Sequence, residues 1–462
     1  MQALRLSMLE RLTLALYGLL VWAVQPLLRR KLQRRAQAEP AYGQHIPERF
    51  GFYAADLDSL WHPSANDPRE CLVWVHAVSL GETRAAAILV NALRAELPGM
   101  RLLLTHSTAT GRAEGAKLLY PGDLQVWLPW DTRAAVNRFL QRFRPQMGVL
   151  METEVWPQLV AACHRHGVPL ALANARLNEK SWRNALRWRE LARPAYAGLS
   201  AVWAQTEADA QRLHDVGAPK PLVLGNIKFD VQPDAAQCAL GKSWRSALGR
   251  PVVMFASSRE GEETLFLQEI KQKYAYALEN KALIATKNVA NASAVMPQVL
   301  WLIVPRHPQR FDEVERLLVA QGLRVSRRST WGSAGPVGAD ADVLLGDTLG
   351  DMALYYSLAD MALLGGSFAP LGGQNLIEAA ACACPVVAGP HTFNFAQATE
   401  QACAAGAAQR VPDMAQAITA ACTLAQQPQA LAQARSAATA FAERHKGTAR
   451  ATAQAVVGLL GV

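Results

Sequence analysis

The sequence lacks the glycine-rich signatures of several common enzyme classes. No Gly-x-Gly-x-x-Gly follows the first apolar run of either half, and no complete Walker-type loop with Lys-Ser or Lys-Thr is present. Ser79 does not stand in the Gly-x-Ser-x-Gly context of an α/β-hydrolase nucleophile. These absences argue against a dehydrogenase, a nucleotide hydrolase and a serine hydrolase.

Cysteine is also sparse, with seven residues scattered over 462. An odd number of scattered cysteines fits poorly with a disulfide framework. Cys382 and Cys384 stand two apart in an apolar, alanine-rich stretch, where no metal or redox partners accompany them. We interpret them as reduced core thiols and predict that the chain works in the cytoplasm.

Charged residues make up 18% of the chain and hydrophobic residues 51%, so most of it should bury a sizeable core. The formal net charge is +9, which favours an anionic partner. No recognisable nucleic-acid-binding module is present and the basic residues do not form one long run. An acidic membrane face or a phosphorylated substrate is therefore expected, and no nucleic acid.

The N-terminus contains an uncharged, largely apolar run, Leu12 to Leu28. These roughly 17 residues barely span a hydrocarbon core of about 30 Å. Five basic residues follow within 29–35 and two precede the run, so the positive-inside rule places the rest of the chain in the cytoplasm. We predict a membrane anchor rather than a cleaved signal peptide. Pro26 and the marginal length leave open whether it spans the bilayer or lies in the interface.

Beyond the anchor, short apolar runs alternate with amphipathic stretches, which predicts an α/β fold with parallel sheets. Strands are expected at 71–76, 101–105, 125–128, 147–151, 170–173, 201–204 and 221–224, and again at 252–256, 300–304, 343–345, 361–364 and 385–388. The pattern predicts two Rossmann-like domains facing a cleft. The expected divisions are the anchor and its basic flank 1–35, a first domain 36–230, a linker 231–242, a second domain 243–430 and a C-terminal helical segment 431–462.

Two acidic motifs follow predicted strands of the first domain. Glu82 closes His-Ala-Val-Ser-Leu-Gly-Glu at 76–82 and opens a helix. Its carboxylate could simply stabilise the helix N-terminus, or it could be a general base beyond the strand end, and its position alone does not decide. Glu152 and Glu154 follow the strand at 147–151, and in an extended stretch they would face the same side. A pair of salt-bridged surface acids remains the plainer alternative.

A basic helix with interleaved tryptophans follows, from Asn174 to Arg193. It suits an anionic lipid or phosphate surface, although an ordinary solvated basic helix would look the same. In the second domain, three loops follow strands: the one at 256–262 that contains Arg259, Pro-Arg-His-Pro at 305–308, and the glycine-rich 365–378. Bare glycines and a helix N-terminus suit an anion, and Glu378 could accept bonds from ribose hydroxyls. Together the three loops indicate a nucleotide site.

These segments, in this order, resemble the 3-deoxy-D-manno-octulosonic acid (Kdo) transferase family. The resemblance extends over nearly the whole chain. It rests on the hydrophobic N-terminus and on the motifs at 76–82, 152–157 (Glu-x-Glu-x-Trp-Pro), 174–177 (Asn-x-Arg-Leu), 225–230 (Gly-Asn-x-Lys-Phe-Asp), 305–308, 345–348 (Leu-Gly-Asp-Thr) and 372–378 (Gly-Gly-x-Asn-x-x-Glu).

The resemblance implies a GT-B fold and a metal-independent, inverting transfer of Kdo from CMP-Kdo to a lipid A precursor, lipid IVA, at the cytoplasmic face of the inner membrane. It implies that Glu82 is the general base and that Glu152 and Lys228 contact the transition state. It implies that CMP is bound by Arg259, Pro305, Arg306, Leu349, Gly350, Asp351, Asn375, Leu376, Ile377 and Glu378. No cofactor is implied.

Three positions depart from the family pattern. Arg259 and Gln374 each stand where a histidine is expected, and Asp351 is one methylene shorter than the usual glutamate. A metal-dependent transferase would instead need an Asp-x-Asp motif. Such triplets occur at 56–58 and 340–342, but neither follows a convincing strand, so we predict no metal. The alternatives are another GT-B envelope enzyme, such as a lipid-A-disaccharide synthase, a nucleotide-sugar epimerase, or a membrane-tethered sugar-nucleotide-binding protein without turnover.

Overall fold

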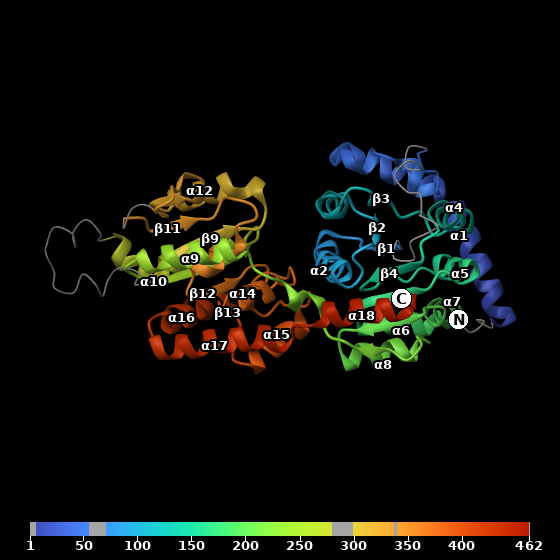
Figure 1. Ribbon diagram of the computed structural model, residues 1–462. Coiled ribbons are helices and arrows are strands. Elements are labelled where there is room, and N and C mark those ends of the chain that lie inside the picture. Colours follow the sequence, from blue (N-terminus) through green and yellow to red (C-terminus); the bar gives the residue numbers. More distant parts are fainter. Residues whose placement is uncertain (1–5, 55–70, 280–298, 337–339, 462) are drawn as a thin grey trace. The chain divides into compact units, whose positions relative to one another are not determined.

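Two seven-stranded parallel sheets organise the chain. The computed structural model describes residues 6–54, 71–279, 299–336 and 340–461. Unit 1 comprises Met1–Asp230 and Lys446–Val462, and unit 2 comprises Val231–His445. Each unit has its own sheet with helices packed around it (Figure 1). The predicted α/β class with parallel sheets is confirmed.

The sheet of unit 1 has the strand order β3-β2-β1-β4-β5-β6-β7, so the order reverses between β1 and β4. In open parallel sheets, ligands bind beyond the carboxyl ends of the strands at such a reversal. The strands are β1 Leu72–His76, β2 Arg101–His106, β3 Leu124–Trp127, β4 Met147–Met151, β5 Leu170–Ala175, β6 Ala201–Ala204 and β7 Leu222–Val223. The helices are α1 Met8–Ala38, α2 Leu80–Glu96, α3 Ala109–Gly115, α4 Arg133–Phe143, α5 Pro157–His166, α6 Glu179–Arg187, α7 Arg189–Ala197, α8 Glu207–Asp215 and α18 Thr448–Leu460, with 3-10 turns η1 Pro40–Gly43, η2 Ile46–Phe50, η4 Ala116–Leu118 and η5 Ile227–Asp230.

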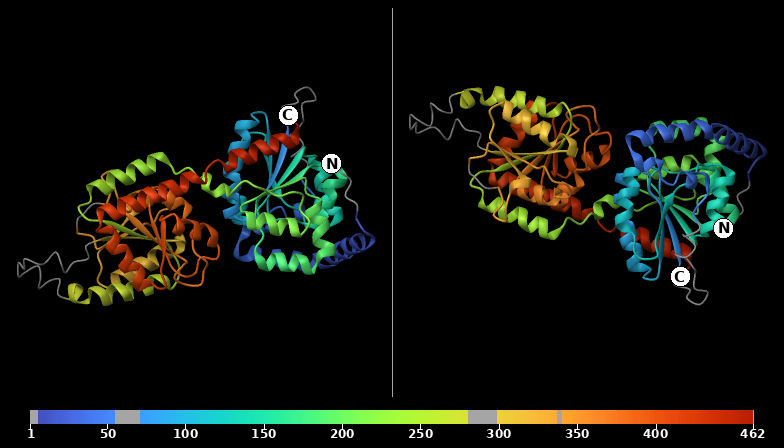
Figure 2. Two further views of the ribbon diagram at one scale, coloured as in Figure 1. Left: turned by 90° about the horizontal axis from the view of Figure 1, so that it is seen from below. Right: turned by 90° about the horizontal axis from the view of Figure 1, so that it is seen from above.

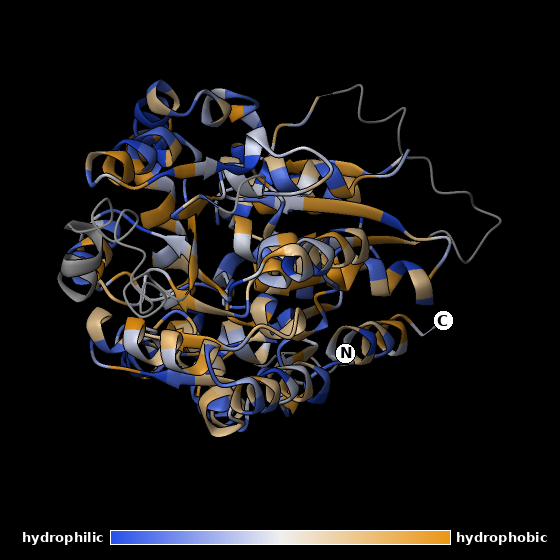
Figure 3. Ribbon diagram, turned by 90° about the vertical axis from the view of Figure 1, so that its left-hand side faces the viewer, coloured by the Kyte–Doolittle hydropathy of each residue, from blue (hydrophilic) through white to orange (hydrophobic). Residues whose placement is uncertain are grey.

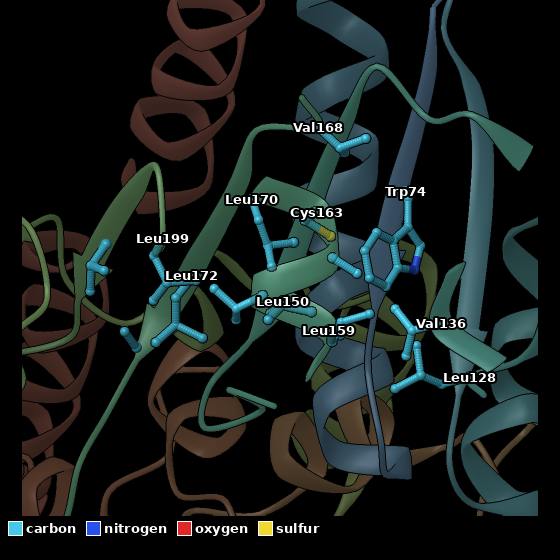
Figure 4. Packing of buried hydrophobic residues seen from close by; sticks show 14 of the residues in the cluster. Trp74, Leu128, Val136, Leu150, Leu159, Cys163, Val168, Leu170, Leu172 and Leu199 are labelled. Atoms are coloured by element: carbon cyan, nitrogen blue, oxygen red, sulfur yellow. The ribbon is translucent and has the colours of Figure 1, made fainter. Parts of the chain in front are cut away.

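Both faces of this sheet are buried. Along β1, Leu72 and Trp74 enter one hydrophobic cluster, with α4, α5 and α8, while Val73 and Val75 enter another, with α2 and α18. Successive side chains of a strand point to opposite faces, so a strand covered on both sides must be apolar throughout. Figure 4 shows the first cluster around Trp74, and Figure 3 shows the strands largely in the hydrophobic colour.

The sheet of unit 2 has the order β10-β11-β9-β8-β12-β13-β14 and reverses between β8 and β12. Its strands are β8 Val252–Ser258, β9 Leu300–Pro305, β10 Val325–Arg327, β11 Val343–Leu345, β12 Met361–Leu364, β13 Val386–Ala388 and β14 Ala408–Arg410. Its helices are α9 Ala235–Ala247, α10 Glu262–Glu279, α12 Phe311–Ala320, α13 Met352–Leu358, α14 Ile377–Ala381, α15 Ala396–Ala404, α16 Met414–Ala425 and α17 Pro428–Arg444, with 3-10 turns η7 Pro308–Arg310 and η8 Arg328–Thr330. Figure 2 shows this unit from two further sides, with helices on both faces of its sheet.

All twelve expected strands are present to within a few residues, and two further strands, β10 and β14, were not predicted. Both are three-residue edge strands without a fully buried side chain, so they carry no apolar pattern. Most of the segment expected as a linker, 231–242, belongs to helix α9, which Asp234 caps. The C-terminal helices are divided between the units, because α17 belongs to unit 2 and α18 to unit 1.

Helix α1 is the one helix in the described part of the chain that is both long and apolar enough to cross a membrane. It lies against α5 and α7 of unit 1 (Figure 1). Polar groups hold it there: the buried Glu10 pairs with Arg193 of α7, and the Gln158 side chain of α5 donates to the Leu14 carbonyl at 2.8 Å. Tyr17 hydrogen-bonds the buried carboxylate of Asp131.

Candidate active site

Glu82 lies in the first turn of α2, directly after β1, at the reversal point of the sheet in unit 1. Its half-buried carboxylate accepts the Val78 N–H at 2.9 Å and the Ser79 hydroxyl at 3.2 Å. Ser79 in turn caps the helix by accepting the Glu82 N–H. This reciprocal pattern resembles a capping box, so the carboxylate does hold the helix N-terminus together.

The pKa of Glu82 is nevertheless unusual for a carboxylate that caps a helix. Burial raises the pKa of Glu82 to about 7, against the ordinary 4.5. The Val78 N–H lowers this pKa, and the negative charges of Glu152 and Glu154 raise it. A carboxyl group with a pKa near 7 can accept a proton efficiently at neutral pH. Glu82 can therefore both stabilise the helix N-terminus and exchange a proton near neutral pH.

Glu152 follows β4, the neighbour of β1 across the reversal point, and its side chain is buried. Its two carboxylate oxygens accept Lys228 Nζ at 2.6 Å and Arg176 Nε at 2.8 Å. Lys228 comes from η5 and Arg176 follows β5, so three predicted motifs meet here. Glu152 and Lys228, which the family resemblance implies as transition-state contacts, thus form an ion pair with each other.

The expectation that Glu152 and Glu154 extend side by side is wrong, because Glu152 has a φ of 57° in the left-handed region. Period-two alternation requires extended backbone at every residue. Glu154 instead accepts the Trp156 indole N–H at 2.9 Å, and burial raises its pKa. Glu152 is thus neutralised by cations, while Glu154 adds its charge to the surroundings of Glu82.

Two buried histidines lie close beneath this site. His76, at the end of β1, contacts the Thr105 hydroxyl through Nδ1 at 2.9 Å, and burial lowers its pKa to about 3. His106 contacts the Ala77 carbonyl at 2.9 Å, and burial lowers its pKa to about 4. Both rings are therefore neutral at physiological pH, and they support the loop that carries Glu82.

The predicted basic helix is two helices, α6 and α7, which meet at Trp188. Trp188 is 67% exposed, whereas Trp182 packs against the hydrophobic core. Arg183 pairs with Glu179 within α6, and Arg193 pairs with Glu10 of α1. This segment therefore has a solvated basic face and also contacts the N-terminal helix α1.

In unit 2, the predicted nucleotide residues all follow the carboxyl ends of neighbouring strands. Arg259 follows β8, while Pro305 is the last residue of β9 and Arg306 comes directly after it. Residues 349–351 follow β11, and residues 375–378 follow β12. These strands are adjacent in the order β11-β9-β8-β12, so the loops meet at one edge of the sheet. The edge includes the reversal point between β8 and β12, where a nucleotide site is expected.

Within this edge, Asn375 orders the start of α14. Its side-chain N–H₂ donates to Glu378 at 3.0 Å and its oxygen accepts the Ile377 N–H at 3.1 Å. Glu378 and Arg306 both act electrostatically on the buried Tyr356. Leu376 and Ile377 are buried and serve packing, while Leu349 is 73% exposed.

The loop after β11 is held by its own contacts. The carboxylate of Asp351 accepts the Thr348 hydroxyl at 2.7 Å and pairs with Arg328 at 3.4 Å. Gly350 has a φ of 89°, and its carbonyl accepts the Gln237 side chain from α9 at 3.0 Å. Asp351 is therefore already engaged, and a shorter side chain suffices for these partners.

Glu262, for which no role was predicted, organises the glycine-rich loop. This fully buried carboxylate accepts the N–H groups of Gly366, Phe368, Ala369 and Arg259 at 2.7–3.2 Å. A carboxylate with four backbone donors fixes the loops after β8 and β12 to each other. A local signal existed, since Glu262 lies three residues after Arg259 in a strand-to-helix turn, but its long-range donors cannot be read from sequence.

The described residues contain no group of three or more histidine, cysteine or acidic side chains arranged to hold a metal ion. In the Asp-x-Asp at 340–342, Asp342 pairs with Arg324 at 3.1 Å and Asp340 is exposed. The other triplet, 56–58, and most of the polar stretch 271–299 lie outside the described residues. All seven cysteines are free thiols, as expected for Cys382 and Cys384.

The chain is similar in sequence and fold to several known proteins. Residues 44–231 match the family model of 3-deoxy-D-manno-octulosonic-acid transferase (kdotransferase). The chain is 46% identical over 455 residues to the 3-deoxy-D-manno-octulosonic acid transferase of Bordetella pertussis, covering 97% of this chain and 99% of that protein. It is 31% identical to the enzyme of the same name from Haemophilus influenzae, with 82% of each chain covered.

Among solved structures, the crystal structure of HepE from Anabaena in complex with UDP-glucose covers 84% of this chain at 14% identity, with a TM-score of 0.53. A UDP-GlcNAc 2-epimerase from Neisseria meningitidis covers 84% at 14% identity, with a TM-score of 0.51. At such identities these structures support the GT-B-like fold alone. The near-full-length identity to the curated enzymes is decisive for the family, and this chain belongs to the 3-deoxy-D-manno-octulosonic acid transferases.

Proposed function

We propose that this protein is an inverting, metal-independent transferase that moves Kdo from CMP-Kdo to a lipid A precursor, with Glu82 as the general base. Membership of the family makes the chain a glycosyltransferase that transfers Kdo in lipopolysaccharide biosynthesis. The proposal adds the acceptor, the stereochemical course and the residues that perform each step.

One observation carries the assignment of the base. Glu82 has a pKa raised to about 7 at the reversal point of the sheet, opposite the Glu152–Lys228 pair. The acceptor hydroxyl must lose a proton as it attacks the anomeric carbon of Kdo, and Glu82 would accept that proton. A positioned base typically contributes 10²–10⁴-fold to the rate, so other groups must share the catalysis.

Glu152 and Lys228 would act on the charge that develops as CMP departs. The anomeric centre becomes positive while the leaving phosphate and the sugar carboxylate are negative. A fixed ion pair supplies both signs without reorganising during the reaction. Arg176 holds the second oxygen of Glu152, so that carboxylate is fixed before substrate binds.

The loops of unit 2 would bind the CMP moiety. Arg306 is suited to the phosphate, and Glu378, oriented by Asn375, is suited to the ribose hydroxyls. The exposed Leu349, Gly350 with its left-handed backbone and Asp351 would form the wall after β11. Arg259 would contribute a second cation to the phosphate, in place of the histidine that the family pattern leads one to expect.

Helix α1 would hold the protein on the cytoplasmic face of the inner membrane. Polar contacts fix one side of the helix to unit 1 near Glu10, Leu14 and Tyr17. The other side exposes leucines, among them Leu12, Leu16 and Leu19. A helix with one docked face and one leucine face suits the membrane interface better than a free bilayer span.

A transfer assay tests the proposal, with CMP-Kdo generated in situ and a tetra-acylated lipid A precursor as acceptor. Wild-type protein should transfer Kdo with inversion at the anomeric centre, and a chelator should leave the rate unchanged. Inhibition by the chelator that Mg²⁺ reverses would contradict the metal-independent mechanism. Binding of CMP-Kdo without transfer would favour a binding protein, and 2-epimerisation of a UDP-sugar would favour an epimerase.

A further inference from the structure

Helix α1 borders the same edge of the sheet that carries Glu82. Its Leu32 packs with Trp127, at the end of β3, and Ala109, which follows β2. Its Leu14 carbonyl accepts the Gln158 side chain at the start of α5, which follows β4. Its Tyr17 hydrogen-bonds Asp131, which follows β3 and accepts the Gln158 N–H. Helix α1 therefore lies along the carboxyl ends of β2, β3 and β4, and β2 and β4 are the direct neighbours of β1, which leads to Glu82.

The outer face of α1 carries an exposed leucine stripe, defined as Leu9, Leu12, Leu16, Leu19, Leu20 and Leu27. Each of these side chains is 54–62% exposed, and their spacing of three, four and seven residues places them on one face of a helix. A stripe of this size beside a basic segment is typical of a helix that enters the membrane interface.

A groove of about 690 Å³ lies beside the stripe, between α1 and η2. Trp22, Ala23 and Pro26 form one wall, and Ile46, Phe50 and Phe52 form the other. This volume falls in the range of ligand pockets, about 300–1,000 Å³. Because most of the lining is apolar and one wall is the membrane helix itself, the groove suits a hydrocarbon chain that enters from the bilayer.

The charged groups of the groove are two arginines, Arg29 and Arg138, and no acidic side chain is among its described lining residues. The Arg138 guanidinium stacks on the Phe52 ring at 4.3 Å and donates to the Phe50 carbonyl, while its buried Nε atom has no partner among the described residues. Two cations beside an apolar channel complement a lipid that carries both a phosphate and an acyl chain.

We propose that this groove binds one acyl chain of the phosphorylated lipid acceptor, with Arg29 and Arg138 near its phosphate. The inference rests on the proposed acceptor and adds a subsite for it. The acceptor is a better occupant than a bulk phospholipid because the groove flanks the sheet edge of the catalytic base. A chain held there restrains the lipid headgroup close to Glu82 while the rest of the lipid stays in the membrane.

The test compares Ala23→Trp, which fills the groove, with Ala15→Trp, which adds the same bulk to an exposed position of α1 outside it. Each methylene kept from an apolar site costs roughly fourfold in affinity. Ala23→Trp should therefore raise the ratio of the KM for acylated acceptor to the KM for its deacylated headgroup by about tenfold or more. Ala15→Trp should keep the wild-type ratio, and Ala23→Leu should change it in the same direction by less.

A binding measurement without donor separates this inference from the proposed function. Native mass spectrometry in detergent should show one acylated acceptor lipid retained by wild type and lost from Ala23→Trp. Retention by wild type without any Kdo transfer would leave the groove intact and contradict the proposed function. Equal retention of phosphatidylglycerol, or an unchanged KM ratio in both Ala23 variants, would overturn the acceptor subsite.

Discussion

The ionisation of Glu82 is the sharpest test of the catalytic assignment. Because the pKa of Glu82 is raised to about 7, only about half of the molecules have an ionised base at neutral pH. The kcat/KM of wild type should rise tenfold per pH unit below about 7 and level off above it. At pH 5.5 it should lie roughly 30-fold below the plateau.

Glu82→Gln removes the base but keeps an oxygen that can accept the Val78 N–H. Its kcat/KM should be lower than that of wild type by about 10²–10⁴-fold and should lose the pH step near 7. Glu96→Gln, near the end of the same helix α2, changes the same residue type far from the site and should retain the wild-type profile.

Folding stability gives a second readout with a defined sign. The folded chain holds the Glu82 proton more tightly than the unfolded chain between pH 4.5 and about 7, so the free energy of unfolding should fall as pH rises through this window. The difference between the pKa of Glu82 in the folded and the unfolded chain corresponds to at most about 3 kcal/mol of unfolding free energy. Solvent near the half-buried side chain reduces this contribution. In urea denaturation, the difference in unfolding free energy between pH 5 and pH 8 should be smaller for Glu82→Gln than for wild type.

A wild-type activity midpoint at the ordinary 4.5, together with an unchanged rate for Glu82→Gln, would refute the base and leave Glu82 as a helix cap. If Glu82 were only a helix cap, Glu82→Gln would change the free energy of unfolding in the opposite direction. An ionised cap is stabilised by the helix N-terminus, so Glu82→Gln would then lower the free energy of unfolding at pH 8 by about 0.3–1 kcal/mol.

Three further changes probe the surroundings of the base and the donor site. Glu154→Gln removes a negative charge that raises the pKa of Glu82, so the midpoint of the pH–rate profile should move to lower pH. Lys228→Met leaves the buried Glu152 with Arg176 alone, which should cost about 1–3 kcal/mol in denaturant unfolding, and the double variant with Glu152→Gln should recover part of this loss. Glu378→Ala should raise the KM for CMP-Kdo about tenfold and leave the KM for the acceptor unchanged, as one lost hydrogen bond to a charged group predicts.

The sequence predicted those features of the fold that depend on local pattern. Every strand with a run of buried apolar residues was found, and the motifs around Glu82, Glu152 and Glu378 were correctly placed after strand ends. Parallel sheets require apolar strands because both faces are covered, which makes their central strands easy to recognise. The edge strands β10 and β14 lack that signal because only part of each is covered.

What could not be predicted depends on contacts between distant residues. The left-handed backbone of Glu152 is fixed by a hydrogen bond of its N–H to Ala173 and by the cations that hold its side chain. The four donors of Glu262 include three from a loop more than a hundred residues away. Arg193 meets Glu10 across 183 positions. Periodicity and spacing along the chain contain no information about such pairs.

The same reasoning explains why position alone could not distinguish a cap from a base at Glu82. Three carboxylates surround the reversal point of unit 1, and their partners differ in kind. Glu152 has two cations, Glu154 has an indole N–H and a hydroxyl, and Glu82 has a backbone N–H and a hydroxyl with two like charges nearby. Neighbouring carboxyl groups in environments this different take different roles. Glu152 is held by two cations, and Glu82 is able to exchange a proton near pH 7, which is the property that a base for the acceptor hydroxyl requires.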